Sequence, residues 1–321
     1  MAVSNFLNVS NSPHIKNKIK TQNIMLDVII AMAPIVVAST IIFGIRSLLV
    51  TLTAVVSCVL FEHVFCLIIK KDTTIYDLSA VVTGMLLAFN LPATIPLWMV
   101  VIGSFFAIVI AKQLFGGIGQ NFVNPALFAR VVMLASFASA MTTWPSPANI
   151  KVVSSATPLA LIAKGDMASI VRLPDVMDMF LGERAGCLGE TCILVIIIGF
   201  VYLVVRKVIS PIIPVTFIAT TAILSLVMYP DINVLISIMS GGIFLGAVFM
   251  ATDYTTSPIS TLGKIIFGVG CGVITMIIRR FASSVEGVSY AILFMNLLVP
   301  YIDKLTRPIP FGVKKQRRAK A

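Results

Sequence analysis

The sequence predicts an all-α integral membrane protein with about ten transmembrane helices, and three observations lead to this fold class. The 321 residues are 58% hydrophobic and only 12% charged, whereas about one quarter of the residues in soluble domains are charged. The mean hydropathy is +1.03. Apolar runs of about 20 residues recur along the chain, and each can cross a hydrocarbon core of about 30 Å as a helix that satisfies its own backbone polar groups.

Apolar runs that lie between charged and turn residues define the candidate spans. In the first half of the chain they are residues 24–43, 48–69, 76–89, 95–111 and 124–140. In the second half they are residues 191–205, 212–229, 233–250, 262–278 and 286–305. The predicted organisation is an N-terminal segment 1–23, a five-helix half 24–140, a polar loop 141–190, a second five-helix half 191–305 and a basic tail 306–321.

Basic residues predict the sidedness of the chain, because loops on the cytoplasmic side of a membrane carry an excess of Lys and Arg. If ten spans alternate, most of these residues, Lys112 among them, fall on the cytoplasmic side. This places both termini in the cytoplasm and the loop 141–190 outside it. Arg279 and Arg280 fall on the opposite side, so they are either buried in a polar site or the number of spans is wrong there. Residues 1–22 lack a signal-peptide pattern.

Two five-span halves that are separated by one loop favour an inverted repeat, an architecture common in transporters. The end of the third span (residues 90–92) and the end of the eighth (residues 252–258) both combine polar residues with proline. The start of the fifth span (residues 116–125) and the tenth span (residues 286–300) share glycine, asparagine and proline. Such helices broken at polar residues also fit a solute channel or secondary transporter, which is the alternative function.

The formal net charge of +11 does not indicate nucleic-acid binding, because the basic residues gather at the termini and at span ends and no nucleic-acid-binding motif is present. His14 and His63 are too few and too far apart for haem ligation. We expect His63 to be a hydrogen-bonded group inside the membrane. Its neighbour Glu62 is either a functional carboxylate within a span or a side chain that snorkels to the surface.

The five cysteines contain no Cys-x-x-Cys pair, so the sequence argues against an iron–sulfur or zinc site within this chain. Cys187 and Cys192 are equally compatible with a disulfide and with free thiols. Gly116, Gly117 and Gly119 do not form the Gly-x-Gly-x-x-Gly pattern of a nucleotide fold. These glycines therefore predict close helix packing or a break in a helix.

A run of small residues in the polar loop forms the pattern Ser-x-Ala-Thr at Ser154, Ser155, Ala156 and Thr157. An uncrowded backbone with one exposed hydroxyl group suits an acceptor for a bulky phosphorylated group. The same residues are also typical of an ordinary turn or helix cap. The pattern by itself leaves both interpretations open.

Six stretches that occur in a fixed order favour the acceptor interpretation of Thr157, because together they resemble the D subunit of the Rnf electron-transport complex. A more distant resemblance is to the B subunit of the sodium-translocating NADH:quinone reductase. The matching stretches are residues 12–15 (SPHI), 77–87 (DLSAVVTGMLL), 112–130 (KQLFGGIGQNFVNPALFAR), 154–159 (SSATPL), 250–258 (MATDYTTSP) and 286–303 (EGVSYAILFMNLLVPYID).

The resemblance implies that Thr157 carries FMN through a phosphoester bond, made outside the cytoplasm by a flavin transferase. It implies an electron-relay subunit in a bacterial or archaeal cell membrane, in a complex that couples electron transfer between ferredoxin and NAD to movement of Na⁺ or H⁺. The partners would include another FMN-bearing subunit and iron–sulfur subunits. The related B subunit also holds noncovalent riboflavin, and the resemblance leaves open whether this chain does.

Polar residues in the broken helices are the candidates for a flavin pocket or an ion path, since polar groups at membrane depth must find partners or line a cavity. For flavin we select Asn121, Asn124 and Arg130. For the ion path we select Asp253, together with Thr252. Helix capping is the alternative role for Asp253.

Overall fold

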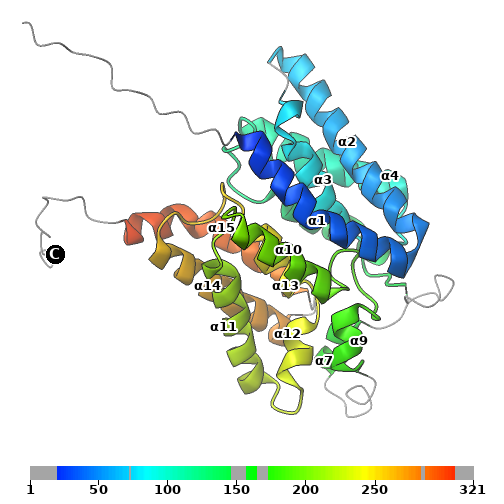
Figure 1. Ribbon diagram of the computed structural model, residues 1–321, viewed down its shortest axis with the longest axis vertical. Helices are drawn as coiled ribbons and strands as arrows, with labels where there is room; N and C mark the ends of the chain where they lie inside the picture. The colour runs from blue at the N-terminus through cyan, green and yellow to red at the C-terminus, as the bar shows by residue number, and fades with distance from the viewer. Residues whose placement is uncertain (1–19, 72–73, 146–156, 165–172, 283–285, 308–321) are drawn as a thin grey trace, which may run out of the picture.

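The computed structural model describes residues 20–71, 74–145, 157–164, 173–282 and 286–307, and every regular element among them is a helix (Figure 1). Five helical segments are long and apolar enough to cross a membrane: Thr21–Phe43, Ile45–Ile69, Leu97–Phe115, Thr261–Phe281 and Gly287–Thr306. Shorter apolar helices cover Ser79–Phe89, Pro125–Ser136, Ile193–Val205 and Ile212–Met228. The prediction of an all-α, multi-pass membrane protein is confirmed.

The first half begins with two long helices and continues with shorter pieces. Its elements are α1 (Thr21–Phe43), α2 (Ile45–Ile69), η1 (Ile75–Asp77), α3 (Ser79–Phe89), α4 (Leu97–Phe105), η2 (Phe106–Ile110), η3 (Gln113–Phe115), α5 (Pro125–Ser136) and α6 (Ala138–Met141). The polar segment between the halves contains α7 (Pro158–Lys164) and α9 (Val176–Leu181). The second half consists of α10 (Ile193–Val205), α11 (Ile212–Met228), α12 (Val234–Met239), α13 (Ile243–Leu245), η4 (Gly246–Met250), α14 (Thr261–Phe281) and α15 (Gly287–Thr306).

Three predicted spans are not continuous helices. The run 76–89 begins in η1 and turns at Leu78 before α3. The run 233–250 is divided into α12, α13 and η4, because the chain turns at Ser240 and at Gly241, whose φ of +66° is unfavourable for residues with a side chain. The run 124–140 ends as α5 at Ser136 and resumes as α6. Hydrophobicity alone does not reveal these breaks, since the residues on either side are equally apolar.

Both halves contain a π-helix of five residues, η2 and η4. Each is closed by a hydrogen bond across five residues, from Ala111 N to Phe106 O (3.0 Å) and from Ala251 N to Gly246 O (2.7 Å). Each is followed by a polar loop and a capped helix, with Asn124 capping α5 and Ser260 capping α14. By this likeness the fourth predicted span (residues 95–111) corresponds to the eighth (residues 233–250). The sequence pattern instead pairs the third span with the eighth.

Glycines let the helices pack at short distances. A Cβ atom at Gly84 of α3 would lie 2.7 Å from Val55 Cα of α2. A Cβ atom at Gly199 of α10 would lie 2.7 Å from the carbonyl oxygen of Ala31 in α1. Small residues at contacts are typical of membrane helices, whose association depends on close van der Waals packing.

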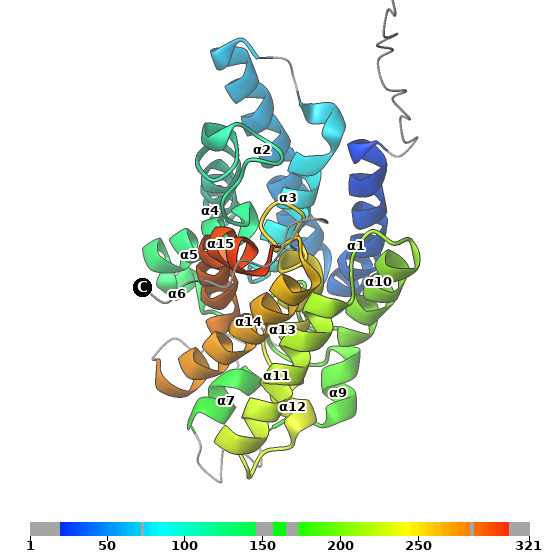
Figure 2. The same cartoon turned by 90° about the vertical axis from the view of Figure 1, so that its left-hand side faces the viewer.

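The two halves meet along two pairs of helices, α1 with α10 and α5 with α15 (Figure 2). At the first contact, Arg206 pairs with Asp27 at 3.2 Å, and the Tyr202 hydroxyl donates to the same carboxylate at 3.0 Å. Large apolar side chains such as Ile41 of α1, Val205 of α10 and Val227 of α11 are exposed, as expected for surfaces that contact lipid. Polar side chains therefore concentrate inside the bundle.

Candidate functional site

A cavity of about 410 Å³ lies between the halves and is lined by four of the residues selected from the sequence. These residues are Asn121, Asn124, Thr252 and Asp253. Apolar side chains of α1, α3, α10 and η4 also line the cavity. The loops that follow η2 and η4 deliver the four polar residues, so the two π-helices place polar groups against one space. The sequence thus identified much of the polar lining of this cavity.

Asn121 and Asn124 play different parts in the wall. The Asn124 side chain accepts hydrogen bonds from Ala126 N (3.1 Å) and Leu127 N (3.3 Å), and its amide donates to Met250 O at 3.3 Å. It therefore joins the start of α5 to the end of η4. The Asn121 amide nitrogen lies 3.4 Å from Thr255 Oγ1, whereas its Oδ1 atom is buried and has no hydrogen-bond partner among the described residues. An orphaned acceptor of this kind fits a ligand that donates a hydrogen bond.

Asp253 does not cap a helix, so that alternative was wrong. Its carboxylate accepts hydrogen bonds from the hydroxyl groups of Thr255 (3.1 Å) and Thr256 (3.3 Å), whereas Ser260 is the residue that caps α14. The Thr252 hydroxyl donates to Val248 O at 2.5 Å. Asp253 is thus a carboxylate at the wall of the cavity, held by a threonine-rich turn.

Lys112 also lines the cavity, and sequence reasoning missed it because it was counted as a cytoplasmic loop charge. Its ammonium group donates to Glu62 Oε2 at 2.8 Å and to Ser79 Oγ at 2.7 Å. Glu62 is completely buried, so it does not snorkel. We expected His63 to be hydrogen-bonded. This is wrong for its Nδ1 atom, which is buried without a partner among the described residues.

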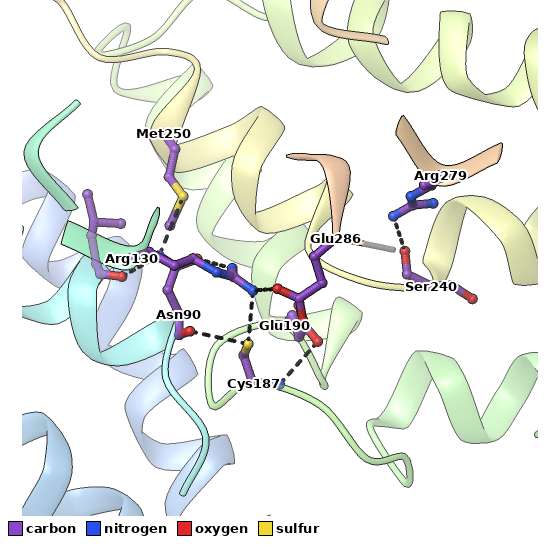
Figure 3. Close-up of polar contacts among 9 residues, drawn as sticks. Asn90, Arg130, Cys187, Glu190, Ser240, Met250, Arg279 and Glu286 are labelled. Atoms are coloured by element: carbon purple, nitrogen blue, oxygen red, sulfur yellow. Dashed lines mark hydrogen bonds and ion pairs between the residues drawn. The ribbon is translucent and has the colours of Figure 1, made fainter. Parts of the chain in front are cut away.

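Arg130 lies outside the cavity and belongs to a second polar cluster (Figure 3). Its guanidinium group donates to Asn90 Oδ1 at 2.5 Å, pairs with Glu286 and lies 3.4 Å from Cys187 Sγ. Arg130 therefore does not share the cavity with Asn121 and Asn124, and its role in flavin binding stays a prediction. Arg130 follows Asn124 by six positions on α5, which turns its side chain toward α3 and α15.

Residues 182–192 of the polar segment fold back against the end of α3. Leu188 N donates to Leu91 O at 3.1 Å, and Gly189 N donates to Phe89 O at 3.0 Å. Cys187 N donates to Glu190 Oε1 at 3.1 Å. Burial raises the pKa of the Glu190 carboxyl, and the neighbouring Glu286 raises it further. Cys187 and Cys192 are both buried free thiols.

Arg184 and Arg279 bind the end of α12. Arg184 donates to the carbonyl oxygens of Met239 and Glu190. Arg279 donates to Ser237 O at 3.2 Å and to Ser240 O at 2.8 Å. The burial of Arg279 confirms the first of the two explanations for its position on the unexpected side, namely that it is buried in a polar site. Arg280 is exposed and lies 5.5 Å from the centre of the Tyr229 ring.

Thr157 lies at the edge of this second cluster. Its Oγ1 atom accepts a hydrogen bond from Ala160 N at 3.2 Å, as a cap of α7 does, and the residue is partly exposed. It also lines a narrow crevice of about 10 Å³ together with Arg184, Glu190 and Glu286. Thr157 therefore acts as a helix cap beside buried charges, whereas its role as an FMN acceptor stays a prediction. Ser154, Ser155 and Ala156 lie outside the described residues.

Comparison with known proteins gives a consistent result over nearly the whole chain. The model of the NQR2, RnfD, RnfE family matches residues 8–312. The D subunit of the Na(+)-translocating ferredoxin:NAD(+) oxidoreductase complex of Acetobacterium woodii is 45% identical over 98% of both chains.

Two further relatives are more distant. The D subunit of the proton-translocating ferredoxin:NAD(+) oxidoreductase complex of Clostridium ljungdahlii is 38% identical, over 97% of this chain and 98% of its own. The D subunit of the ion-translocating oxidoreductase complex of Escherichia coli O7:K1 is 34% identical, over 96% and 99%. Because the family model covers residues 8–312 and these relatives match over nearly their full length, the chain belongs to the NQR2, RnfD, RnfE family.

Proposed function

We propose that this chain is the membrane electron-relay subunit of an Rnf-type complex that couples ferredoxin:NAD oxidoreduction to ion translocation, and that it carries FMN on Thr157. The relatives that match over nearly their full length are named as D subunits of such complexes. Iron–sulfur subunits, a second FMN-bearing subunit and a flavin transferase are the partners of this proposal. The bound flavin would exchange one or two electrons, and the protein would position it.

The observation that carries the proposal is the position of Thr157. Thr157 is partly exposed at the start of α7, where a transferase can approach it, and Arg184 lines the crevice beside it. Arginine binds phosphate oxygens well, because its planar guanidinium group presents several donors to an anion. The Ser-x-Ala-Thr pattern adds the small neighbours Ser155 and Ala156. The distribution of basic residues predicts that this segment lies outside the cytoplasm. The chain itself would span a bacterial or archaeal cell membrane, as the resemblance implies.

The cavity of about 410 Å³ is the place that we propose for noncovalent riboflavin. Its mostly apolar wall suits a flat aromatic ring system, and a few polar groups suffice to orient such a ligand. The orphaned Oδ1 atom of Asn121 supports the assignment, because flavin rings and ribityl chains carry donors. Asp253 and Thr252, on the same wall, are the proposed ion-path residues.

The first experiment replaces Thr157 with alanine in a strain that contains the native flavin transferase. Thr157→Ala should abolish covalent flavin, seen as in-gel fluorescence of the denatured chain, without reducing its amount in membranes. The peptide that spans Thr157 should carry the mass of FMN only in the unchanged chain. Thr142→Ala is the matched control, because Thr142 is an exposed hydroxyl residue near the start of the same polar segment.

An unmodified Thr157 in the unchanged chain would contradict covalent attachment. Flavin that leaves the Thr157→Ala chain on denaturation, and that lacks phosphate, would support riboflavin in the cavity. A chain with neither flavin would favour the alternative of a solute channel or secondary transporter, since broken helices around a cavity suit both functions.

A further inference from the structure

The cluster beside Thr157 contains more positive than negative charge. Arg130, Arg184 and Arg279 are 4–5% exposed, and they face the two carboxylates Glu190 and Glu286. Three guanidinium groups against two carboxylates leave an excess of one positive charge among the described residues. Buried charge without a counter-charge is costly, because the protein interior solvates ions poorly.

Hydrogen bonds to carbonyl oxygens do not remove this excess. Arg184 and Arg279 both donate to backbone carbonyls near the end of α12, which supply partial charges only. The Nε atom of Arg279 is buried and has no hydrogen-bond partner among the described residues. The cluster therefore lacks both a full negative charge and one acceptor.

The crevice beside Thr157 has the size for one small group. Its volume of about 10 Å³ is close to the space that a single water molecule needs, so it admits one phosphoryl oxygen but not a ring system. Gly241 forms part of its wall, and a Cβ atom there would lie 2.8 Å from Arg279 Nη2. The glycine thus keeps the approach to Arg279 open.

We propose that the phosphodiester on Thr157 is the missing counter-charge, with one phosphoryl oxygen bound by Arg184 in the crevice and Arg279 supplying a second positive charge behind Gly241. This inference rests on the proposed attachment of FMN to Thr157. A phosphodiester carries one negative charge at neutral pH, which matches the excess. The flavin ring then lies outside the crevice, and Arg184 and Arg279 are positioning residues for it.

The test compares the thermal stability of the full chain with and without flavin, made in the presence and absence of the flavin transferase. Peptide mass first establishes loading at Thr157, so failure of the proposed function is seen before stability is measured. Loading should raise the Tm of the unchanged chain by a few degrees. Arg184→Gln should lose most of that rise, whereas Arg184→Lys should retain much of it because the charge is kept.

Arg46→Gln is the matched control. Arg46 also donates to two backbone carbonyls, Ala93 O at 3.1 Å and Thr94 O at 3.0 Å, but it is not part of the crevice. Its loss should lower the Tm of loaded and unloaded chains equally. If Arg184→Gln behaves in the same way, Arg184 only caps α12 and the inference is overturned.

Glu286→Gln provides a test in the opposite direction, which remains available if Arg184→Gln does not fold. Removal of this carboxylate, the partner of Arg130, increases the positive excess. Loading should then raise the Tm by more than in the unchanged chain. An equal or smaller rise, or no rise on loading in the unchanged chain, would exclude charge balance by the phosphodiester.

Discussion

Glu62 and Lys112 are 50 residues apart in the sequence, yet their charged atoms lie 2.8 Å apart in the interior. The ammonium group also donates to Ser79, and Glu62 also accepts from Thr74. A buried ion pair with satisfied hydrogen bonds can be nearly neutral for stability, whereas a single buried charge without its partner is strongly destabilising. The two residues therefore depend on each other.

We expect Glu62→Gln to lower the free energy of unfolding by about 3–5 kcal/mol, because it leaves the Lys112 ammonium group buried and unpaired. The double variant Glu62→Gln with Lys112→Met should lose less than the Glu62 variant alone. Denaturant titration of the detergent-solubilised chain measures both values. Arg206→Gln is the control, since it breaks an ion pair at a half-exposed arginine and should have a smaller effect. A double variant that is no more stable than Glu62→Gln alone would contradict the coupling.

At the scale of elements, the contact between α2 and α3 depends on the absence of a side chain at Gly84. Both helices are apolar along this contact, so lipid would solvate their surfaces as well as the partner helix does. Close backbone approach is what favours the pair. A Cβ atom at Gly84 would lie 2.7 Å from Val55 Cα and 2.9 Å from Ala54 O, atoms of the α2 backbone that cannot rotate away.

Gly84→Ala should therefore destabilise the chain by about 1–3 kcal/mol, the usual cost of overpacking. Gly103→Ala is the matched control, because a Cβ atom there would lie 3.4 Å from the flexible Met133 side chain. Both changes gain the same helix propensity, so their difference isolates the packing term. The measurement compares the unfolding midpoints of the two variants, and Gly84→Ala should have the lower one. Equal midpoints would mean that α3 shifts to accommodate the methyl group.

At the scale of the whole molecule, α5 connects the cavity with the charged cluster. Asn124 lines the cavity at the start of the helix, and Arg130 lies in the cluster about 9 Å further along the axis. Met250 touches both sides, because its carbonyl oxygen accepts from Asn124 and its sulfur lies 3.7 Å from the Asn90 amide. The two proposed flavin sites are thus separated by one short stretch of packed protein.

The proposed coupling of electron transfer to ion translocation is a property of the whole molecule. Asp253→Asn keeps the shape of the side chain but removes its charge from the cavity wall, so ion translocation should fall more than electron transfer between ferredoxin and NAD. Both rates are measured in vesicles that contain the assembled complex. Asp231→Asn, at an exposed position of the same half, should change neither rate. Equal loss of both rates at Asp253 would indicate a folding defect.

The sequence by itself determined that this chain lies in a membrane and where its long apolar helices fall, because hydrophobicity is a local property that single residues report. It also identified Asn121, Asn124, Thr252 and Asp253, since polar residues in broken helices must line a space or find partners. Thr157 was selected as a candidate flavin acceptor through the resemblance, since its small neighbours alone left a turn or helix cap open.

Only the tertiary structure decided which charges meet. Lys112 was expected in a loop and lies opposite Glu62, and Arg130 joins Glu286 and not Asn124. Residues 182–192 have the composition of a polar loop, yet they are mostly buried against the end of α3 and bring Arg184 next to Thr157. These pairings are long-range, and their free energy depends on burial and geometry that no local pattern encodes.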